Sequence, residues 1–441
     1  MELVQNDAAD PITYVGRGYI YQDSEGILSF KLYTHEVRNA PGIFHELTQL
    51  IGTPGTLYKE DRYYSLSCLS YQGDNWRTPR LLISITRLND DVLVSGRLFA
   101  ISCTRTVQHS TEKQYYHRLH VFDDIDLPFM EFIETVTATE RIHSRHRARL
   151  SLNRKEFDIR KGDGEIIVEV ASQSPFPSNF FMRIIEAMTF VSARQAIFRV
   201  LVLGDDKAEE FRLTSPRMQS STTKMRKPID TVQLAEPNMF WRLFSTFLEY
   251  AINNAPERGW NRCAVHIQNA IDASAKSLDA WAVGLCVAVD GLSQMVAVQE
   301  DAGENTKRCK LIEHVKTFLK ERGWNESTIG NRALGLLSQL HQLRVKDRLE
   351  PLVASGVIDK ELVQAWSRLR HPSAHGTVFD IEAAPKEEVE KLWHEIDTVT
   401  TLLYLIVYHL IGYRGFYTDY SKMGWETVQV RVPDQRKDPT P

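Results

Sequence analysis

The chain has 441 residues, of which 43% are hydrophobic and 25% charged, as in an ordinary globular protein with two or three domains. The formal net charge of −4 excludes a protein that is basic overall, so any nucleic-acid site must be a local patch. Five scattered cysteines without a C-x-x-C pair indicate free thiols, and we expect no metal site and no cofactor. The first residues lack the basic and apolar regions of a signal peptide, and the apolar runs fall short of the ~18 residues of a membrane span, so we expect a cytoplasmic protein without a membrane partner.

The N-terminal half carries β signals. Between residues 14 and 121, short runs rich in β-branched and aromatic residues are separated by Gly, Asp, Asn and Pro. A second β-leaning block, residues 128–211, contains a hairpin with its turn at Lys161–Gly164 and one helix from Asn179 to about Arg194. Strands at this spacing predict a sandwich or a barrel, so we assign residues 1–213 to one β-rich domain, as a single body or as two lobes.

The C-terminal half carries helical signals. Residues 214–236 are polar at their start and lack apolar periodicity, which favours a solvated linker over a segment that contacts phosphates. From residue 237 to residue 432 the apolar residues recur with the period of a helix, and residues 433–441 form a predicted disordered tail. The predicted helices are Met239–Ala251, Ala264–Gln299 with a break near Gly284 or Gly291, Asn305–Glu321, Ser327–Leu343, Asp359–Leu369 and Lys386–Tyr413. The predicted fold class is therefore an α+β multidomain protein, in which a β-rich sandwich-like or barrel-like unit precedes an all-α bundle.

One short motif, Arg-His-Pro-Ser-Ala-His-Gly starting at Arg370, combines groups that can break RNA. The guanidinium of Arg370 offers a permanent charge and a planar fork of donors that matches a phosphate, and the imidazole of His375 titrates near neutral pH. Because Pro372 disfavours a helix interior, we predict that the preceding helix ends near Leu369 or Arg370, which would bring Arg370 and His375 together. Arg368 is a rival for the role of the motif arginine.

This pattern resembles the R-x4-6-H motif of the HEPN ribonuclease superfamily, in which the residue after the arginine is commonly Asn, Asp or His, here His371. The run Leu-Arg-His-Pro-Ser-Ala-His-Gly followed by a helix is most similar to the ApeA-type HEPN domains of bacterial anti-phage proteins. The resemblance covers roughly residues 240–415. It implies a metal-independent endoribonuclease in which His375 is the general base or acid and Arg370 stabilises the charge of the transition state. His371 would position the phosphate or share proton transfer, with a helix-end surface histidine as the alternative.

The resemblance also implies an acidic residue on an early core helix. Asp290 is the candidate because a carboxylate on an apolar stretch needs a partner, and a structural contact to an arginine or a backbone donor is the alternative. Further implications are a homodimer through the helical domain, RNA (tRNA among the candidates) as substrate, and a toxin of abortive infection whose N-terminal domain senses a phage-derived trigger. The alternatives are a non-catalytic HEPN module that binds a nucleotide or a protein, and a β-domain recognition protein dimerised by its helical half.

The largest basic excess in the chain lies between Glu140 and Lys161, where eight Arg or Lys face three acidic residues, leaving a local charge of +5 (eight minus three). Such a patch can neutralise several phosphates of RNA, and an exposed edge strand protected by charge is the alternative. The predicted RNA-binding residues are Arg141, Arg145, Arg147, Arg149, Arg154 and Lys155.

Overall fold

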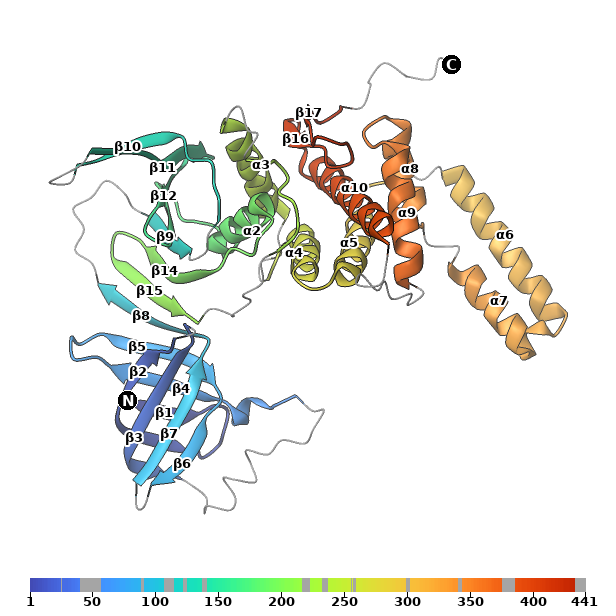
Figure 1. Ribbon diagram of the computed structural model, residues 1–441. Helices are drawn as coiled ribbons and strands as arrows, with labels where there is room; N and C mark the ends of the chain where they lie inside the picture. The colour runs from blue at the N-terminus through green and yellow to red at the C-terminus, as the bar shows by residue number, and fades with distance from the viewer. Residues whose placement is uncertain are drawn as a thin grey trace. The chain divides into compact units, whose positions relative to one another are not determined.

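The computed structural model of the chain divides into two compact units, one dominated by an antiparallel sheet and one by helices, so the protein is a mixed α+β protein (Figure 1). The first unit comprises Met1–Ile185 and Ala196–Ser221, and the second comprises Glu186–Gln195 and Thr222–Pro441. The structure describes residues 1–24, 26–39, 57–88, 91–106, 115–121, 125–136, 141–215, 223–231, 237–254, 256, 259–298, 302–339, 343–374 and 385–432. Of residues 87, 88, 91, 132–136, 141–145, 302, 304, 305, 325 and 371–374, only the backbone is described. The predicted tail, residues 433–441, lies outside these ranges.

One sheet of fifteen antiparallel strands forms the described part of the first unit, in the order β10-β11-β12-β13-β9-β14-β15-β8-β5-β4-β1-β2-β3-β7-β6. The strands are β1 (Glu2–Gln5), β2 (Thr13–Gln22), β3 (Leu28–Arg38), β4 (Tyr64–Leu69), β5 (Asn75–Leu81), β6 (Ser84–Leu88), β7 (Asp91–Leu98), β8 (Ala100–Thr106), β9 (Tyr115–Val121), β10 (Glu131–Val136), β11 (Arg141–Leu152), β12 (Lys155–Lys161), β13 (Ile166–Ser172), β14 (Phe198–Gly204) and β15 (Ala208–Thr214). The predicted hairpin is confirmed, because β12 pairs with β13 across the Lys161–Gly164 turn.

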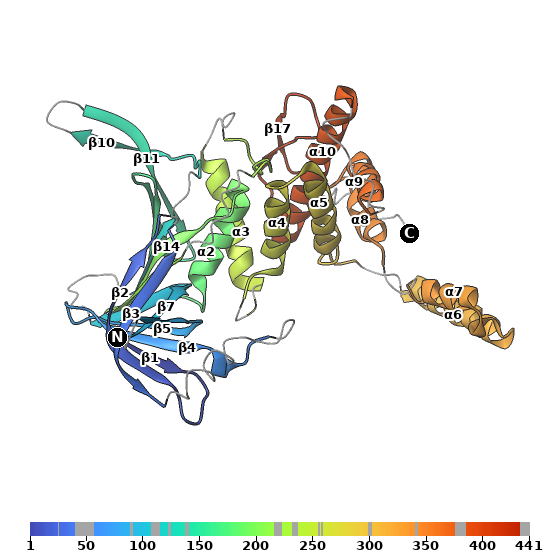
Figure 2. The ribbon, with the colours of Figure 1, turned by 60° about the horizontal axis from the view of Figure 1, so that its bottom comes forward.

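Strands β1–β8, which we call the N-terminal lobe, curl around a shared apolar core (Figures 1 and 2). Alternation with a period of two sends one face of each strand inward: in β3, Leu28, Phe30 and Leu32 are buried and the residues between them are not. At the end of β7, Leu98 is buried, whereas Phe99 is exposed at the point where the chain passes into β8.

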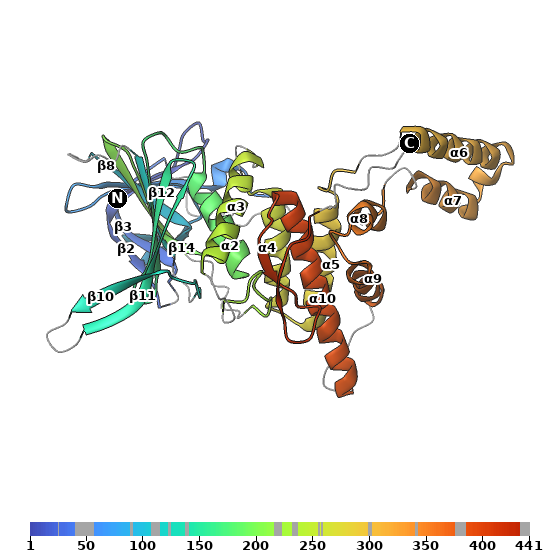
Figure 3. The same cartoon turned by 90° about the horizontal axis from the view of Figure 1, so that it is seen from above.

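Strands β9–β15 make up the rest of the sheet, and helix α2 (Phe180–Ser192) begins against them, with Phe180 packed on Phe157 and His117. Strands β10 and β11 extend as a long two-stranded ribbon (Figure 3). The division between the two units falls within α2, after Ile185, so the second half of this helix belongs to the helical unit. Nothing in the sequence pattern of α2 indicated that division.

The second unit is built from helices. They are α3 (Asn238–Asn254), α4 (Arg262–Ser274), α5 (Leu278–Ser293), α6 (Ala302–Glu321), α7 (Thr328–Gln339), α8 (Val345–Ala354), α9 (Lys360–Ala374) and α10 (Lys386–Ile411), with a C-terminal hairpin of β16 (Phe416–Thr418) and β17 (Thr427–Gln429). Helix α5 is central, because it packs against α4, α8, α9 and α10 (Figures 1 and 2). Helices α6 and α7 lie side by side (Figure 3). Helix α8 was not predicted; it contains Pro351 and buries only two leucines.

The predicted break in the long helix at Gly284 or Gly291 is wrong. The chain breaks instead between α4 and α5, where the Ser277 hydroxyl caps α5 by accepting from the backbone N–H of Ala280. The two glycines lie inside α5 because α4 packs so closely. A Cβ on Gly284 would lie 2.3 Å from the Ala273 Cβ, and one on Gly291 would lie 2.1 Å from the His266 ring.

The expectation of a solvated linker is wrong for residues 223–231. Met225 and Ile229 are buried, and the carbonyl of Arg226 accepts from the hydroxyl of Tyr404 on α10. The carbonyl of Pro228 accepts from a second α10 tyrosine and from the backbone of β16. Polar composition misled the prediction here, because these contacts are made mostly by backbone groups.

Candidate active site at the contact of α5 and α9

Helix α9 presents an apolar face to its neighbours. Leu362, Ala365, Trp366 and Leu369 recur at a helical spacing, and all four are buried where α9 packs on α5 and α10. Arg370 follows directly after this face, so its side chain emerges at the border between the packed surface and solvent. The helix does not end near Leu369 or Arg370 as predicted but continues to Ala374. Pro372 lies in the last turn, where its missing N–H leaves the carbonyl four residues earlier without that donor.

The structure brings Arg370 together with Asp290, two of the four predicted catalytic residues. Nη2 of Arg370 lies 3.4 Å from Oδ2 of Asp290 on α5. The guanidinium also lies 5.5 Å from the centre of the Trp366 ring, one turn earlier on α9, at cation–π distance. The Arg370 side chain is 53% exposed and that of Asp290 is 27% exposed. A fixed cation is therefore held on two sides and open to solvent on the others.

Burial dominates the electrostatics of this contact. Desolvation raises the pKa of Asp290, while the Arg370 charge and the Trp366 indole N–H oppose that rise. One turn earlier on α5, burial and the neighbouring Asp290 carboxylate raise the pKa of Cys286 to about 12, against the opposing charge of Arg370. Cys286 is thus an inert buried thiol. Oδ1 of Asp290 and Nε1 of Trp366 are both buried without a well-aligned hydrogen bond among the described residues.

The two arginines that compete for the motif role have different partners. Nε of Arg368 donates to the carboxylate of Glu395 on α10 at 3.0 Å, whereas Arg370 faces Asp290 on α5. Two positions apart on a helix, side chains differ in direction by about 200°. Arg368 therefore ties α9 to α10, and Arg370 belongs to the contact with α5.

The histidines of the motif are placed only in part. The backbone of His371 is part of α9, and its side chain is among those not described. His375 lies outside the described residues, so the predicted approach of Arg370 and His375 stays a prediction. A histidine that the sequence analysis missed, His266 on α4, packs against Gly291, and burial lowers its pKa. The one sequence feature that pointed to a close neighbour here was Gly291, directly after Asp290.

The predicted RNA-binding stretch lies mostly on β11, and its two arginines on that strand whose side chains are described have carboxylate partners across the sheet. Nε of Arg147 donates to Asp158 at 2.8 Å in a forked pair, and Arg149 lies 3.7 Å from Glu131. These pairs reduce the free positive charge that the sequence count suggested.

The other members of the stretch have different settings. Arg154 is exposed in the β11–β12 turn with a positive φ of 61°, and the Lys155 ammonium lies 5.8 Å from the Phe180 ring centre. Of Arg141 and Arg145, only the backbone is described. The predicted RNA-binding residues therefore lie on β11, in the β11–β12 turn and at the start of β12, all in the first unit, whereas Arg370 belongs to the second.

Within the described ranges, no cluster of three or more His, Cys, Asp or Glu side chains could hold a metal ion. None of the helices described combines the length and the apolar character that crossing a lipid bilayer requires. No protein-family model, no curated protein and no solved structure matches the chain.

Proposed function

We propose that the chain is a metal-independent endoribonuclease of the HEPN type, with its active site at Arg370 and His375, acting in bacterial anti-phage defence by abortive infection. One observation carries the proposal: a half-exposed guanidinium, held by Asp290 and Trp366 at a helix contact, precedes the motif histidine by five residues. The helical unit with α5 at its centre would be the HEPN bundle. The cellular role rests on the resemblance of the motif to ApeA-type domains.

The groups of the motif suit attack by the substrate's own hydroxyl. His375 takes the proton from the ribose 2′-hydroxyl, and the new bond forms between the 2′-oxygen and phosphorus. The bond from phosphorus to the 5′-oxygen breaks, and that oxygen receives a proton, from His371 or from the protonated His375. Arg370 meets the extra negative charge on the phosphate oxygens in the transition state. The products are a 2′,3′-cyclic phosphate and a 5′-hydroxyl.

Asp290 acts in this scheme as a positioning residue. At 3.4 Å its carboxylate orients the guanidinium without forming the tight fork that would occupy two of its donors. The remaining N–H groups of Arg370 stay available for a phosphate. Arg368 lacks this arrangement because Glu395 already accepts from it, which favours Arg370 as the motif arginine.

The rest of the chain serves this activity. We assign the N-terminal unit to sensing a trigger or restraining the nuclease, because a ribonuclease that is always active would harm its host. One Arg–His pair is a sparse active site, so a homodimer through the helical unit would bring two copies together. The basic residues of β11 and its turn, chiefly Arg154 and Lys155, would add contacts to the RNA backbone.

A cleavage assay on the purified full-length protein tests the proposal. Wild-type protein should cut RNA, and Arg370→Ala and His375→Ala should each lose cleavage while keeping the circular dichroism spectrum and the melting temperature of the wild type. Both side chains are polar and Arg370 is half-exposed, so little packing is lost. Near-normal cleavage by either variant would remove that residue from the active site, and a non-catalytic HEPN module would then be the better description.

A further inference from the structure

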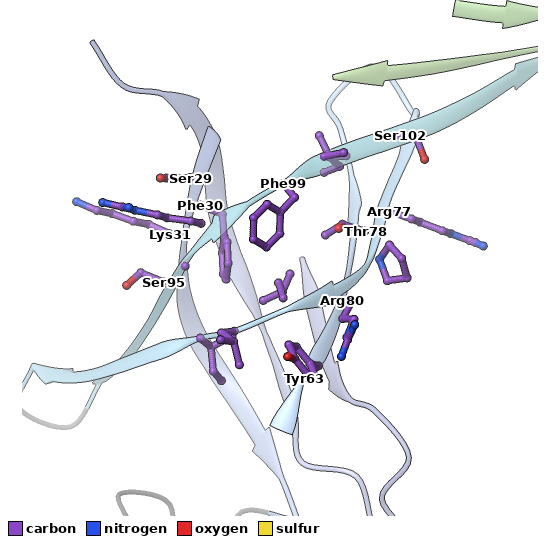
Figure 4. A pocket seen from close by; sticks show the side chains of 18 of the residues that line it. Ser29, Phe30, Lys31, Tyr63, Arg77, Thr78, Arg80, Ser95, Phe99 and Ser102 are labelled. Carbon is purple, nitrogen blue, oxygen red and sulfur yellow. The ribbon is translucent and has the colours of Figure 1, made fainter. Parts of the chain in front are cut away.

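A large cavity opens in the N-terminal lobe, wholly within the first unit. Its volume is about 1120 Å³, and residues of β3, β5, β7 and β8 line it. It lies where β5 and β8 separate, since these strands pair only at Trp76 and Arg77. Figure 4 shows Phe30 and Phe99 near one another, with Lys31 and Arg77 on opposite sides and their charged ends directed outward, away from the two rings.

The charged residues that line the cavity are all cations. Its lining includes five cations and no carboxylate: Lys31, Arg77, Arg80, Arg97 and Arg212. Arg80 pairs with Glu60 and lies over the Tyr63 ring, and Arg212 pairs with Glu210. The other three make no ion pair with a carboxylate among the described residues. The cavity thus keeps cations that are not neutralised, in contrast to the arginines of β11.

The aromatic content of the cavity is also unusual. Phe99 is 75% exposed, although phenylalanine is ordinarily a core residue. It stands at the junction of β7 and β8, where the chain leaves one strand and enters the next, so its ring faces the opening and not the core. Phe30 and Ile101, both buried, form apolar wall beneath it. An exposed ring among unpaired cations is a surface to which a ligand with a flat apolar face and a negative charge is complementary.

We infer that this cavity binds the nucleotide units of a single-stranded nucleic acid, with a base stacked on Phe99 and phosphates held by Lys31, Arg77 and Arg97. Stacking platforms next to a basic groove are the general chemistry by which proteins hold single strands. The volume of about 1120 Å³ lies at the upper end of small-molecule pockets and has room for a base with its sugar and phosphate, and cations on opposite sides of it suit a strand that passes across. The inference does not rest on the ribonuclease proposal, because binding here uses neither Arg370 nor His375.

Fluorescence anisotropy with a labelled 2′-O-methyl uridine 12-mer tests this inference on the full-length protein. The probe lacks the 2′-hydroxyl, so binding is measured without cleavage. Phe99→Ala should weaken binding by about tenfold or more, the loss of one stacked base. Arg97→Gln should weaken binding and should lower the slope of log K against log salt by about 1, the loss of one phosphate contact.

Two matched variants on the same lobe serve as controls. Tyr71→Ala removes a fully exposed aromatic ring outside the cavity, and Arg17→Gln removes an exposed strand arginine that does not line it. Both should bind the probe as the wild type does. If Phe99→Ala binds as tightly as Tyr71→Ala, or if the probe does not bind the wild type at all, the inference is wrong.

Two competitors separate the sources of the ligand. Uridine monophosphate should displace the probe only at far higher concentration than an unlabelled strand. If the two are equally potent, the cavity binds a free nucleotide, and the inference of a strand is wrong. Inorganic polyphosphate carries charge without bases. If it displaces the probe equally well from wild-type protein and from Phe99→Ala, the site is a general anion site and the stacking part of the inference is overturned.

Discussion

Two arginine–aspartate pairs, one in each unit, show why similar sequence features have different consequences. On the sheet, Arg147 and Asp158 on the paired strands β11 and β12 form a forked, hydrogen-bonded pair with Nε donating at 2.8 Å. At the helix contact, Arg370 and Asp290 approach only to 3.4 Å and make no well-aligned hydrogen bond. The first pair occupies two donors of its arginine in a tight fork, and the second leaves the corresponding donors available.

The acids of the two pairs differ in the same way. Burial alone would raise the pKa of Asp158, but the hydrogen bonds and charge of Arg147 outweigh it and the pKa is lowered. For Asp290 burial prevails over Arg370, and the pKa is raised. A tight pair therefore stabilises the fold, whereas a loose, half-buried pair keeps a cation in place for a ligand. This difference separates a structural arginine from a candidate catalytic one.

The largest expected effect is on cleavage. Arg370→Ala should lower the rate of RNA cleavage by roughly 10²–10³-fold, because it removes a preorganised cation at the position where charge develops. Arg147→Ala is the control, since it removes an arginine that also pairs with an aspartate but holds it in a tight fork of two hydrogen bonds. Its cleavage rate should stay within a few-fold of wild type. If both variants lost cleavage to the same extent, the Arg370 pair would not differ in function from the Arg147 pair.

The second effect concerns assembly at the helical unit. If two copies of the Arg370 site face each other, cleavage should come from a dimer. The Arg147–Asp158 ion pair lies within one chain and does not depend on assembly. Multi-angle light scattering on the full-length protein should give twice the chain mass, and activity per chain should fall on dilution. A strictly monomeric species that cleaves at full rate would contradict the composite site.

The effect on stability should be smaller, and here Arg147→Ala should have the larger effect of the two variants. Arg147→Ala should lower the free energy of unfolding by about 1 kcal/mol, because it removes the two hydrogen bonds that the guanidinium donates to the half-buried Asp158 carboxylate. Arg370→Ala should change it by less than about 0.5 kcal/mol, the usual range for an exposed side chain. Urea unfolding of both variants, followed by circular dichroism, measures the two values. A larger loss for Arg370→Ala would assign that pair a structural role.

The smallest effect is the pH dependence of stability, and its sign should differ between the pairs. Because the pKa of Asp158 is lowered in the folded state, its contribution is present above the unfolded pKa and is lost as the pH falls through the folded value. The pKa of Asp290 is raised, so the folded state binds more protons between the ordinary value of 3.8 and the raised one, and stability falls as the pH rises through that window.

Asparagine variants separate these contributions. Asp158→Asn should destabilise the protein most at neutral pH, and Asp290→Asn should make stability less dependent on pH just above the ordinary carboxyl range. Melting temperatures measured across the acid range test both expectations. Identical profiles for the two variants would show that the environments of the two acids are alike.

The sequence predicted the helices and strands well, but it predicted poorly which residues distant in the sequence contact one another. Periodicity located the helices around Met239–Ala251 and Asn305–Glu321 to within a few residues. It misplaced the helix break, because Gly284 and Gly291 serve close packing of α4 and not a bend. Which carboxylate a given arginine meets depends on strand register and helix packing, so the charge count for β11 overstated its free charge.

The candidate site was predictable in part. An isolated carboxylate on an apolar helix needs a partner, which was enough to single out Asp290, and the structure supplies Arg370 as that partner. The contact of the Trp366 ring with the guanidinium was not predicted, because it depends on the helix continuing through Arg370. The cavity with Phe99 gave no sequence signal at all, because its cations come from strands far apart in the chain.

The most direct test of the central claim is cleavage of an RNA that carries a single 2′-deoxy residue at the cut site, with excess EDTA present. The claim is that the 2′-hydroxyl of the substrate attacks its own phosphate with only Arg370 and the motif histidines assisting. It predicts that unmodified RNA is cut in EDTA to give 2′,3′-cyclic phosphate ends, and that the deoxy position is not cut. Cutting at the deoxy position, or activity lost in EDTA and restored by magnesium, would contradict it.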